Sequence, residues 1–140
     1  MNVLGIGTDI VENLRIAQMI ERHGELFLRR VYTPHEIEYC RVRKASTQHY
    51  AGRWAAKEAV LKALGTGWSP GIRWLDVELR NEDGGPPRVA LRGGALQVSR
   101  QAGIAEILIS ISYCRSHAVA YALALGTSPE DADSAEADAR

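Results

Sequence analysis

The spacing of apolar residues changes after Gly71, and this change constrains the fold more than any other feature of the sequence. Before it, apolar residues recur three and four positions apart, as they do along one face of an α-helix. After it, Leu75, Val77 and Leu79 alternate with charged residues, which is typical of a half-buried strand. Helices in the first half followed by strands predict an α+β fold, with helices packed on a small antiparallel sheet.

The first half opens with a short strand and a helix. Residues 3–6 form a β-branched and aliphatic run that ends in glycine, which indicates the strand. The helix should begin at Asn13, a candidate cap, and Gly24 is placed to end it in a left-handed conformation.

Two further helices are expected before the strands. Thr33-Pro34-His35-Glu36 predicts a helix start, because threonine caps, proline suits the first helical position, and glutamate can reach back to the cap. This helix should extend to about residue 44. The next covers about residues 47–64 and ends at Gly65. Its apolar stripe consists of Ala51, Trp54, Ala55, Glu58 and Leu61.

The second half is expected to form two hairpins around a short helix. Residues 74–92 alternate in polarity on both sides of a turn-rich segment, which predicts the first hairpin. Residues 94–102 form the helix, and residues 107–113 and 118–125 form the second hairpin.

The chain of 140 residues is long enough for one domain with its own core. No run approaches the ~18 consecutive apolar residues of a membrane helix, and the first residues lack the basic segment and apolar run of a signal peptide. We therefore expect a cytoplasmic protein without a membrane partner. Cys40 and Cys114 lie far apart and show no metal-ligand spacing, which favours reduced thiols.

The net charge of zero hides an asymmetry between the body of the chain and its end. Residues 127–140 hold five acidic residues against Arg140, a net charge of −4, which leaves 16 basic and 12 acidic residues, a net of +4, in residues 1–126. Because the end has no apolar period, we expect one domain over residues 1–126 and a disordered acidic tail over residues 127–140. The basic helical half should attract anions, unless it is only a solvated surface.

Asp9 is the first residue that could carry chemistry. It follows Gly5-Ile6-Gly7-Thr8, but a dinucleotide-binding motif would need a third glycine where Ile10 stands. What remains is a carboxylate just beyond the end of the first strand. Such a residue can bind a ligand or, more commonly, cap a turn or a helix.

Glu58 lies on the apolar stripe of the third helix, and a carboxylate directed inward needs a compensating partner. Lys62, one turn later, could form an ordinary helix ion pair with it. Alternatively, Glu58 and Asp9 could hold a hard cation while Lys62 faces an anionic substrate. Two carboxylates suffice for magnesium when the substrate supplies phosphate oxygens.

Lys62 also precedes a glycine-rich helix exit, Gly65-Thr66-Gly67, whose backbone N–H groups could cradle a phosphate or simply end the helix. The order is not that of a P-loop, in which the lysine follows the glycines. Four upstream basic residues could bind phosphates or form a solvated surface: Arg41, Arg43, Lys44 and Arg53. They form no array interleaved with aromatic residues, so nucleic acid is not an expected partner.

Taken together, three segments closely resemble the holo-[acyl-carrier-protein] synthase family: residues 5–12 (GIGTDIVE), 33–36 (TPHE) and 51–67 (AGRWAAKEAVLKALGTG). The resemblance extends over about residues 2–125 in the same order. It implies an enzyme that transfers the 4′-phosphopantetheine of coenzyme A to a serine of apo acyl carrier protein and releases adenosine 3′,5′-bisphosphate.

The resemblance also implies roles for individual residues. Asp9 and Glu58 would hold Mg²⁺, Lys62 would stabilise the transition state and leaving group, and Glu58 or a metal-bound water beside it would be the base. The residues that would contact coenzyme A are Lys44, Arg53, Lys62, Gly65, Thr66 and Pro87. Leu108 and Tyr113 stand where many family members have histidine, so this part of the nucleotide site departs from the pattern.

Assembly and partner binding are implied by the same resemblance. It implies a homotrimer with active sites between neighbouring subunits, and it places the acidic carrier protein against the first helix. There Arg15, Met19 and Arg22 follow at i, i+4 and i+7, so they share one face.

Two other functions stay open from the residues alone. A non-catalytic basic module that binds an acidic protein or RNA would not need Glu58 and would be indifferent to magnesium. A coenzyme A-dependent acyltransferase would need a base near the thioester, and the sequence presents no histidine-centred pair.

Overall fold

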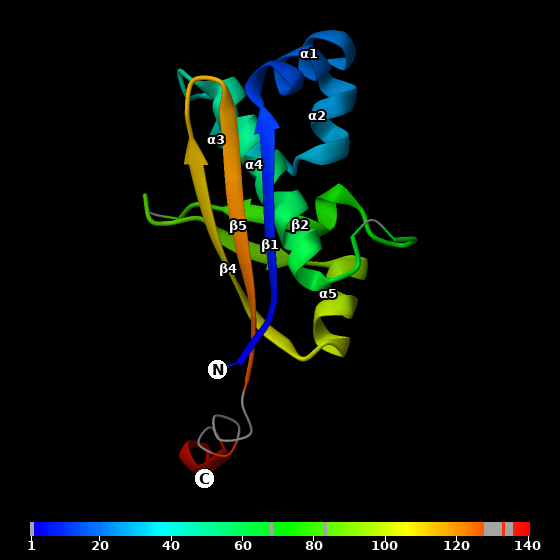
Figure 1. The fold of residues 1–140 in the computed structure, drawn as a ribbon, viewed down its shortest axis with the longest axis vertical. Coiled ribbons are helices and arrows are strands. Elements are labelled where there is room, and N and C mark those ends of the chain that lie inside the picture. Colours follow the sequence, from blue (N-terminus) through cyan, green and yellow to red (C-terminus); the bar gives the residue numbers. More distant parts are fainter. Residues whose placement is uncertain (1, 68, 83, 128–132, 134–135) are drawn as a thin grey trace.

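The computed structural model describes residues 2–67, 69–82, 84–127, 133 and 136–140. Within them, short helices and two small sheets surround one long helix (Figure 1). The elements, in chain order, are β1 (Asn2–Glu12), α1 (Asn13–His23), α2 (Glu25–Val31), α3 (Pro34–Arg41), α4 (Ser46–Leu64), the 3₁₀ turn η1 (Trp74–Asp76), β2 (Val77–Arg80), β3 (Arg88–Leu91), α5 (Gly93–Gln101), β4 (Ile104–Tyr113) and β5 (His117–Gly126).

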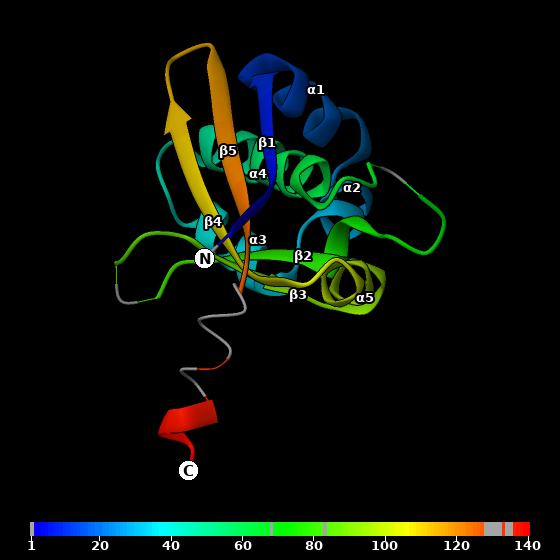
Figure 2. The ribbon, with the colours of Figure 1, turned by 60° about the horizontal axis from the view of Figure 1, so that its bottom comes forward.

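The main sheet has three antiparallel strands in the order β1-β5-β4. Asp9 of β1 lies opposite Ala120 of β5, and Gly7 lies opposite Ala122. β2 and β3 form a separate two-stranded hairpin. Figures 1 and 2 show α4 crossing behind the three strands, with the other helices gathered around it. The antiparallel sheet and the packed helices confirm the predicted α+β fold.

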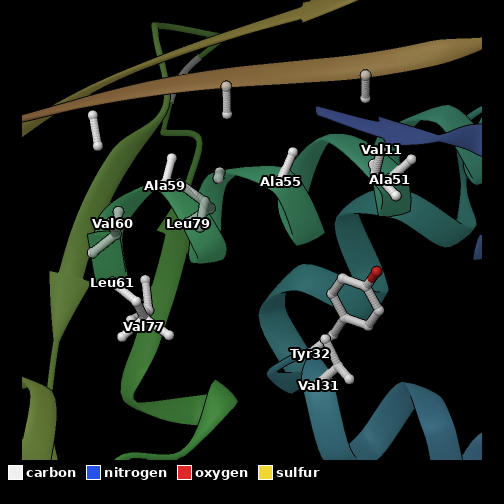
Figure 3. Packing of buried hydrophobic residues seen from close by; sticks show 14 of the residues in the cluster. Val11, Val31, Tyr32, Ala51, Ala55, Ala59, Val60, Leu61, Val77 and Leu79 are labelled. Atoms are coloured by element: carbon white, nitrogen blue, oxygen red, sulfur yellow. The ribbon is translucent and has the colours of Figure 1, made fainter. Parts of the chain in front are cut away.

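The C-terminal half of α4 lies against β1 at very close range. An added Cβ at Gly7 would stand 1.9 Å from the carbonyl oxygen of Ala59, and one at Gly5 would stand 2.0 Å from that of Ala63. Only glycine allows the two backbones to approach this closely. Small residues continue the interface: Figure 3 shows Ala55 and Ala59 pointing toward the sheet. The residues that face them from β5 are Ala118, Ala120, Ala122 and Ala124.

The other sides of α4 pack on the helices and on the β2–β3 hairpin. Leu61 lies beside Val77 of β2 (Figure 3). The hydroxyl of Tyr32, which follows α2, donates a hydrogen bond of 2.8 Å to the carbonyl oxygen of Tyr50. The helix is therefore the centre of the core, with apolar contacts on most of its surface.

Several predicted boundaries are confirmed. The Thr33 hydroxyl accepts a hydrogen bond from the backbone of Glu36, and the Glu36 carboxylate accepts one from the backbone of Thr33, so the predicted capping box starts α3. Gly65 ends α4 in the left-handed conformation. Both predicted hairpins and the short helix between them are present.

Other predictions near the N-terminus are wrong. β1 continues to Glu12, so Asp9 lies inside a strand rather than beyond its end. Asn13 does not cap α1, because its side chain instead donates hydrogen bonds of 3.1 Å to the carbonyl oxygens of Cys114 and Arg115 in the β4–β5 turn. The sequence prediction also missed α2.

Two further boundaries differ from the prediction. α3 ends at Arg41 rather than near residue 44, and residues 74–76 form a 3₁₀ turn instead of the start of a strand. Within the predicted acidic tail, residues 128–132 and 134–135 lie outside the described residues, so the tail and the domain boundary stay predictions. Over the part of the chain that is described, none of the helices is both long and apolar enough to cross a bilayer.

Candidate active site

One stripe of α4 is not buried. Between Tyr50 and Leu64, every residue is buried except Trp54, Glu58 and Lys62, which follow one another at intervals of one turn. The prediction that Glu58 lies on a buried stripe is therefore wrong: it is half-buried. The spacing of apolar residues at intervals of three and four could not distinguish the open face of α4 from its buried faces, because nearly the whole helix is apolar and covered.

Lys62 connects this stripe to β1. Its Nζ donates a hydrogen bond of 2.8 Å to the carbonyl oxygen of Thr8 and lies 3.3 Å from Oδ1 of Asp9. The Asp9 side chain is 19% exposed, so this carboxylate is held largely inside the interface between β1 and α4. The structure thus brings together the first and third segments of the predicted site.

The packing of β1 on α4 also indicates which turn of the helix lies beside Asp9. The step from Gly5 to Gly7 along β1 corresponds to the step back from Ala63 to Ala59 along α4. Two residues of strand and four residues of helix both advance by about 6 Å. The next step on the same face of β1 reaches Asp9, and the matching step along α4 reaches Ala55. We therefore expect Asp9 to lie beside the turn from Ala55 to Ala59, which includes Glu58.

The two carboxylates define what kind of metal site could form here. Among the described residues, no group of three or more histidine, cysteine, aspartate or glutamate side chains could hold a metal ion by itself. Asp9 and Glu58 fit Mg²⁺, because this ion is commonly bound by one or two carboxylates together with water and substrate phosphates. The donor set therefore suits a metal that binds with a phosphate-bearing substrate.

Beyond Lys62, α4 ends at Gly65, as predicted, and both glycines of this helix end have positive φ angles. Gly65 and Gly67 have φ values of 81° and 55°, which favour glycine, and the Thr66 hydroxyl lies 3.2 Å from the carbonyl oxygen of Gly67. These residues follow Lys62 by about one turn, at the C-terminal end of α4.

A second group of candidate residues lies at the N-terminal half of α4, against the end of β4. Arg53 is buried, and its guanidinium donates to Oδ1 of Asn81 and to the Tyr113 hydroxyl oxygen, the latter at 3.5 Å. It also stacks on the ring of Tyr39 at 3.9 Å, and Arg43 lies over the same ring at 3.3 Å. Two guanidiniums thus gather around one aromatic ring, which makes this end of the sheet strongly positive. Lys44 follows in an exposed turn.

Tyr113 fills the place where the family resemblance leads one to expect histidine. Its ring packs against His49, with 5.4 Å between ring centroids. Burial lowers the pKa of His49, and the neighbouring Arg53 and Arg43 guanidiniums lower this pKa further. Nε of Arg53 and Nδ1 of His49 are buried and have no hydrogen-bond partner among the described residues. An imidazole is therefore present beside this position, although on α4 rather than on β4.

A groove of about 790 Å³ lies between β3, α5 and β4. Pro87 and Leu108 line it. Pro87 is a predicted contact to coenzyme A, and Leu108 stands where many family members have histidine. Arg88 and Arg100 line the same groove, and the sequence analysis missed both. Arg88 could have been found from the sequence, because it directly follows Pro87. Arg100 could not, because nothing local distinguishes it from any basic residue in the last turn of a helix.

The candidate residues fall into two groups on opposite edges of the main sheet. Asp9 and Lys62 lie at β1, and Glu58 precedes Lys62 by one turn of α4, whereas Arg53 and the groove lie at β4, with β5 between them. Neighbouring strands are about 4.8 Å apart, so about 10 Å separates β1 from β4. One copy of the chain does not bring all the predicted residues into one pocket.

The predicted partner-binding residues lie on α1, beside the open stripe of α4. Arg15 and Arg22 are exposed and Met19 is half-buried. The guanidinium of Arg15 lies 6.0 Å from the ring centroid of Trp54. A protein that docks on this face of α1 would therefore reach the stripe that carries Glu58 and Lys62.

Comparisons with known proteins agree with this arrangement. The curated holo-[acyl-carrier-protein] synthase of Desulforudis audaxviator is 50% identical over 126 residues, which cover 90% of this chain and 95% of that protein. The one from Protochlamydia amoebophila is 49% identical and covers 86% of this chain and 96% of its own length.

Solved structures of the same enzyme also match. The holo-[acyl-carrier-protein] synthase of Neisseria meningitidis has a TM-score of 0.80 and 30% identity, covering 89% of this chain and 99% of that chain. The Helicobacter pylori enzyme in complex with coenzyme A has a TM-score of 0.76 and 29% identity, covering 86% and 99%. A model of the 4′-phosphopantetheinyl transferase superfamily matches residues 5–122. The chain belongs to this superfamily and groups with its holo-[acyl-carrier-protein] synthases.

Proposed function

We propose that this protein transfers the 4′-phosphopantetheine group of coenzyme A to a serine of an apo acyl carrier protein. The observation that carries the proposal is the contact between Lys62 and Asp9, which joins a carboxylate on β1 to the one stripe of α4 that stays open. The relatives that match this chain over most of their length are named for this reaction.

The metal site of the proposal consists of Asp9 and Glu58, with the diphosphate of coenzyme A completing the coordination. Mg²⁺ bound there supplies positive charge that offsets the negative charge of the phosphate oxygens during attack. The protein holds both carboxylates on rigid elements, because β1 and α4 are in direct backbone contact. Such fixed placement is what positions reacting groups for an in-line displacement.

The transfer itself is a substitution at phosphorus. The serine oxygen forms a bond to the phosphorus next to pantetheine, and the bond from this phosphorus to the bridging oxygen breaks, releasing adenosine 3′,5′-bisphosphate. Glu58 accepts the serine proton. Lys62 places its ammonium beside Asp9, where it stabilises the charge that develops on the leaving group.

The remaining predicted contacts to coenzyme A would hold its nucleotide end. We assign this role to Lys44, Arg53, Gly65, Thr66 and Pro87, and add Arg88 and Arg100 because they line the groove with Pro87. Guanidiniums suit this role, because they bind phosphates through two parallel hydrogen bonds.

We further propose that the enzyme is a homotrimer with each active site between two subunits. The two groups of candidate residues lie at opposite edges of the sheet, so β1 of one subunit next to β4 of another would unite them. The sheet face that points away from α4 is also rich in exposed apolar side chains, which favours association. These side chains are Val3, Ile6, Ile10, Leu108 and Tyr121. Sedimentation equilibrium that shows a monomer at fully active concentrations would contradict this assembly.

The carrier protein would dock on α1 through Arg15, Met19 and Arg22. Two guanidiniums around a flexible apolar side chain suit an acidic partner with an apolar patch. The cytoplasm is the expected compartment, because Cys40 and Cys114 are free thiols.

Product release tests the reaction class. The protein is incubated with coenzyme A, Mg²⁺ and an apo carrier protein, and adenosine 3′,5′-bisphosphate is measured by chromatography. Release is expected only when all three are present, and Asp9→Ala should abolish it. An acyltransferase would instead consume acyl-coenzyme A and release free coenzyme A, and a binding module would release neither.

A further inference from the structure

Glu36 and Lys57 form an ion pair inside the core. Nζ of Lys57 lies 2.8 Å from Oε1 of Glu36, and both side chains are fully buried. The ammonium also donates to the carbonyl oxygen of Trp74, at 3.1 Å, and to that of Val77. All three of its protons therefore have acceptors, two of which belong to the backbone around η1.

Glu36 is held as firmly as its partner. Its Oε1 accepts a hydrogen bond of 2.8 Å from the backbone of Thr33, and its Oε2 accepts one of 3.0 Å from the backbone of Leu79. The capping glutamate of α3 thus extends its role into the core. Through this pair, α3, α4, η1 and β2 are joined by charged hydrogen bonds.

A gain in stability does not by itself explain why a protein would bury an ion pair. Removing two charges from water costs free energy that their attraction only partly returns, and apolar residues of similar size are often at least as stable. Buried polar groups are better known for fixing the register of packed helices. The interface between α4 and the sheet needs such a device.

That interface is smooth. Gly5 and Gly7 of β1 and the alanines of β5 face alanines of α4, so along this part of the interface neither side presents large side chains that would interlock. Tyr113 of β4 packs on α4 only near Gly52, toward the other end of the helix. The contact between these glycines and alanines fixes the distance between the two backbones, but it resists rotation or sliding of the helix less than interlocking side chains would. The position of Glu58 relative to Asp9 depends on both movements.

We propose that the Glu36–Lys57 pair is a positioning device that fixes the rotation and axial position of α4 and thereby holds Glu58 opposite Asp9. Lys57 directly precedes Glu58 on α4. Anchoring Lys57 therefore sets the direction of the Glu58 side chain, which lies about 100° further around the helix axis. The part of this inference that concerns Glu58 rests on the proposed function, whereas the part that concerns α4 does not.

The structure contains its own reporter for the position of α4. Trp54 of α4 stacks on Trp74 of η1, with 4.2 Å between ring centroids and 30° between ring planes. Lys57 contacts the carbonyl oxygen of the same Trp74. Near-ultraviolet circular dichroism of this coupled pair will change if α4 turns or slides. The chain has three tryptophans, so the spectrum is recorded in a Trp68→Phe background.

The test replaces the pair with apolar residues in the double variant E36L/K57M. We expect a Tm that is unchanged or higher, an altered tryptophan spectrum, and a Mg²⁺ requirement for half-maximal activity that rises about 10- to 100-fold, as for residues that orient metal ligands. A wild-type spectrum would overturn the proposal whatever the Mg²⁺ requirement. An altered spectrum with a wild-type Mg²⁺ requirement would overturn the part that concerns Glu58.

Two further variants keep the test decisive. Leu28→Ala removes a buried side chain of α2 and should lower the Tm without changing the spectrum or the Mg²⁺ requirement. If E36L/K57M does not fold, Glu36→Gln is measured instead; smaller changes in the same direction support the proposal, and wild-type values refute it. If the wild type itself needs no Mg²⁺, the proposed function fails, while the tryptophan spectrum still decides whether the pair fixes α4.

Discussion

Replacing Gly7 with alanine tests whether the contact between β1 and α4 sets the active-site geometry. The added Cβ would stand 1.9 Å from the carbonyl oxygen of Ala59 and 2.8 Å from the backbone nitrogen of Ala63. Ordinary van der Waals contact begins near 3.4 Å, so the strand and helix would have to separate by about 1.5 Å. Neither neighbour can rotate away, because both are backbone atoms.

This overlap lowers the free energy of unfolding. Overpacking of a core costs typically 1–3 kcal/mol, and a clash with backbone belongs at the upper end, about 3 kcal/mol. Alanine recovers about 0.5–1 kcal/mol, because it has less freedom than glycine in the unfolded chain. The net loss is about 2 kcal/mol, which corresponds to a fall in Tm of about 8 °C for a domain of this size.

The same separation should impair catalysis. A misplacement of about 1 Å in reacting groups can reduce the rate about 100-fold. Tm is measured by circular dichroism and transfer by product release, with Gly85→Ala as the control for stability. At Gly85 an added Cβ meets only the Glu82 carbonyl oxygen, at 3.2 Å, so its Tm should stay within about 2 °C of the wild type. A Gly7→Ala enzyme with wild-type Tm and rate would refute the reasoning.

Four other changes have defined outcomes. Glu58→Gln should reduce transfer by at least about 100-fold without lowering the Tm of the metal-free protein, since it removes a metal ligand rather than a packing contact; wild-type transfer would exclude Glu58 as a ligand. The double variant R15E/R22E should raise the KM for carrier protein and weaken its salt dependence, with little change for coenzyme A; unchanged carrier kinetics would move the docking surface elsewhere. Because burial and two guanidiniums lower the pKa of His49, the folded protein loses stability as pH falls through the ordinary histidine pKa of 6.5. The Tm of the wild type should therefore drop more steeply than that of His49→Phe between about pH 8 and pH 5, and parallel curves would contradict this origin. A chain truncated at Thr127 should keep full transfer activity, and a loss would show that the acidic end takes part in the site.

Much of the fold could be predicted because the relevant signals are local. The capping box from Thr33 to Glu36, the left-handed Gly65 and the alternation at Val77 and Leu79 each act over a few residues. The carboxylates Asp9 and Glu58 were found because an acidic residue among glycines and another among apolar residues stand out against their neighbours.

The rest depends on contacts between residues far apart in the chain. Asn13 resembles a helix cap, but its partners in the β4–β5 turn lie 101 and 102 residues away, and such contacts leave no local pattern. The length of β1 was underestimated, because its inner face is made of Gly5 and Gly7 and its outer face stays exposed, so the usual alternation is missing. The buried Lys57 could not be distinguished from a surface lysine, since its partner comes from another helix.

This chain is expected to move phosphopantetheine from coenzyme A to a carrier protein, and Asp9 and Glu58 are its proposed metal ligands. The most direct measurement is the intact mass of an apo carrier protein after incubation with the enzyme, coenzyme A and Mg²⁺. We predict a gain equal to one phosphopantetheine group, lost when Mg²⁺ is chelated or when either carboxylate is replaced by alanine. A carrier of unchanged mass would contradict the proposed activity, and full modification by Asp9→Ala would contradict the site.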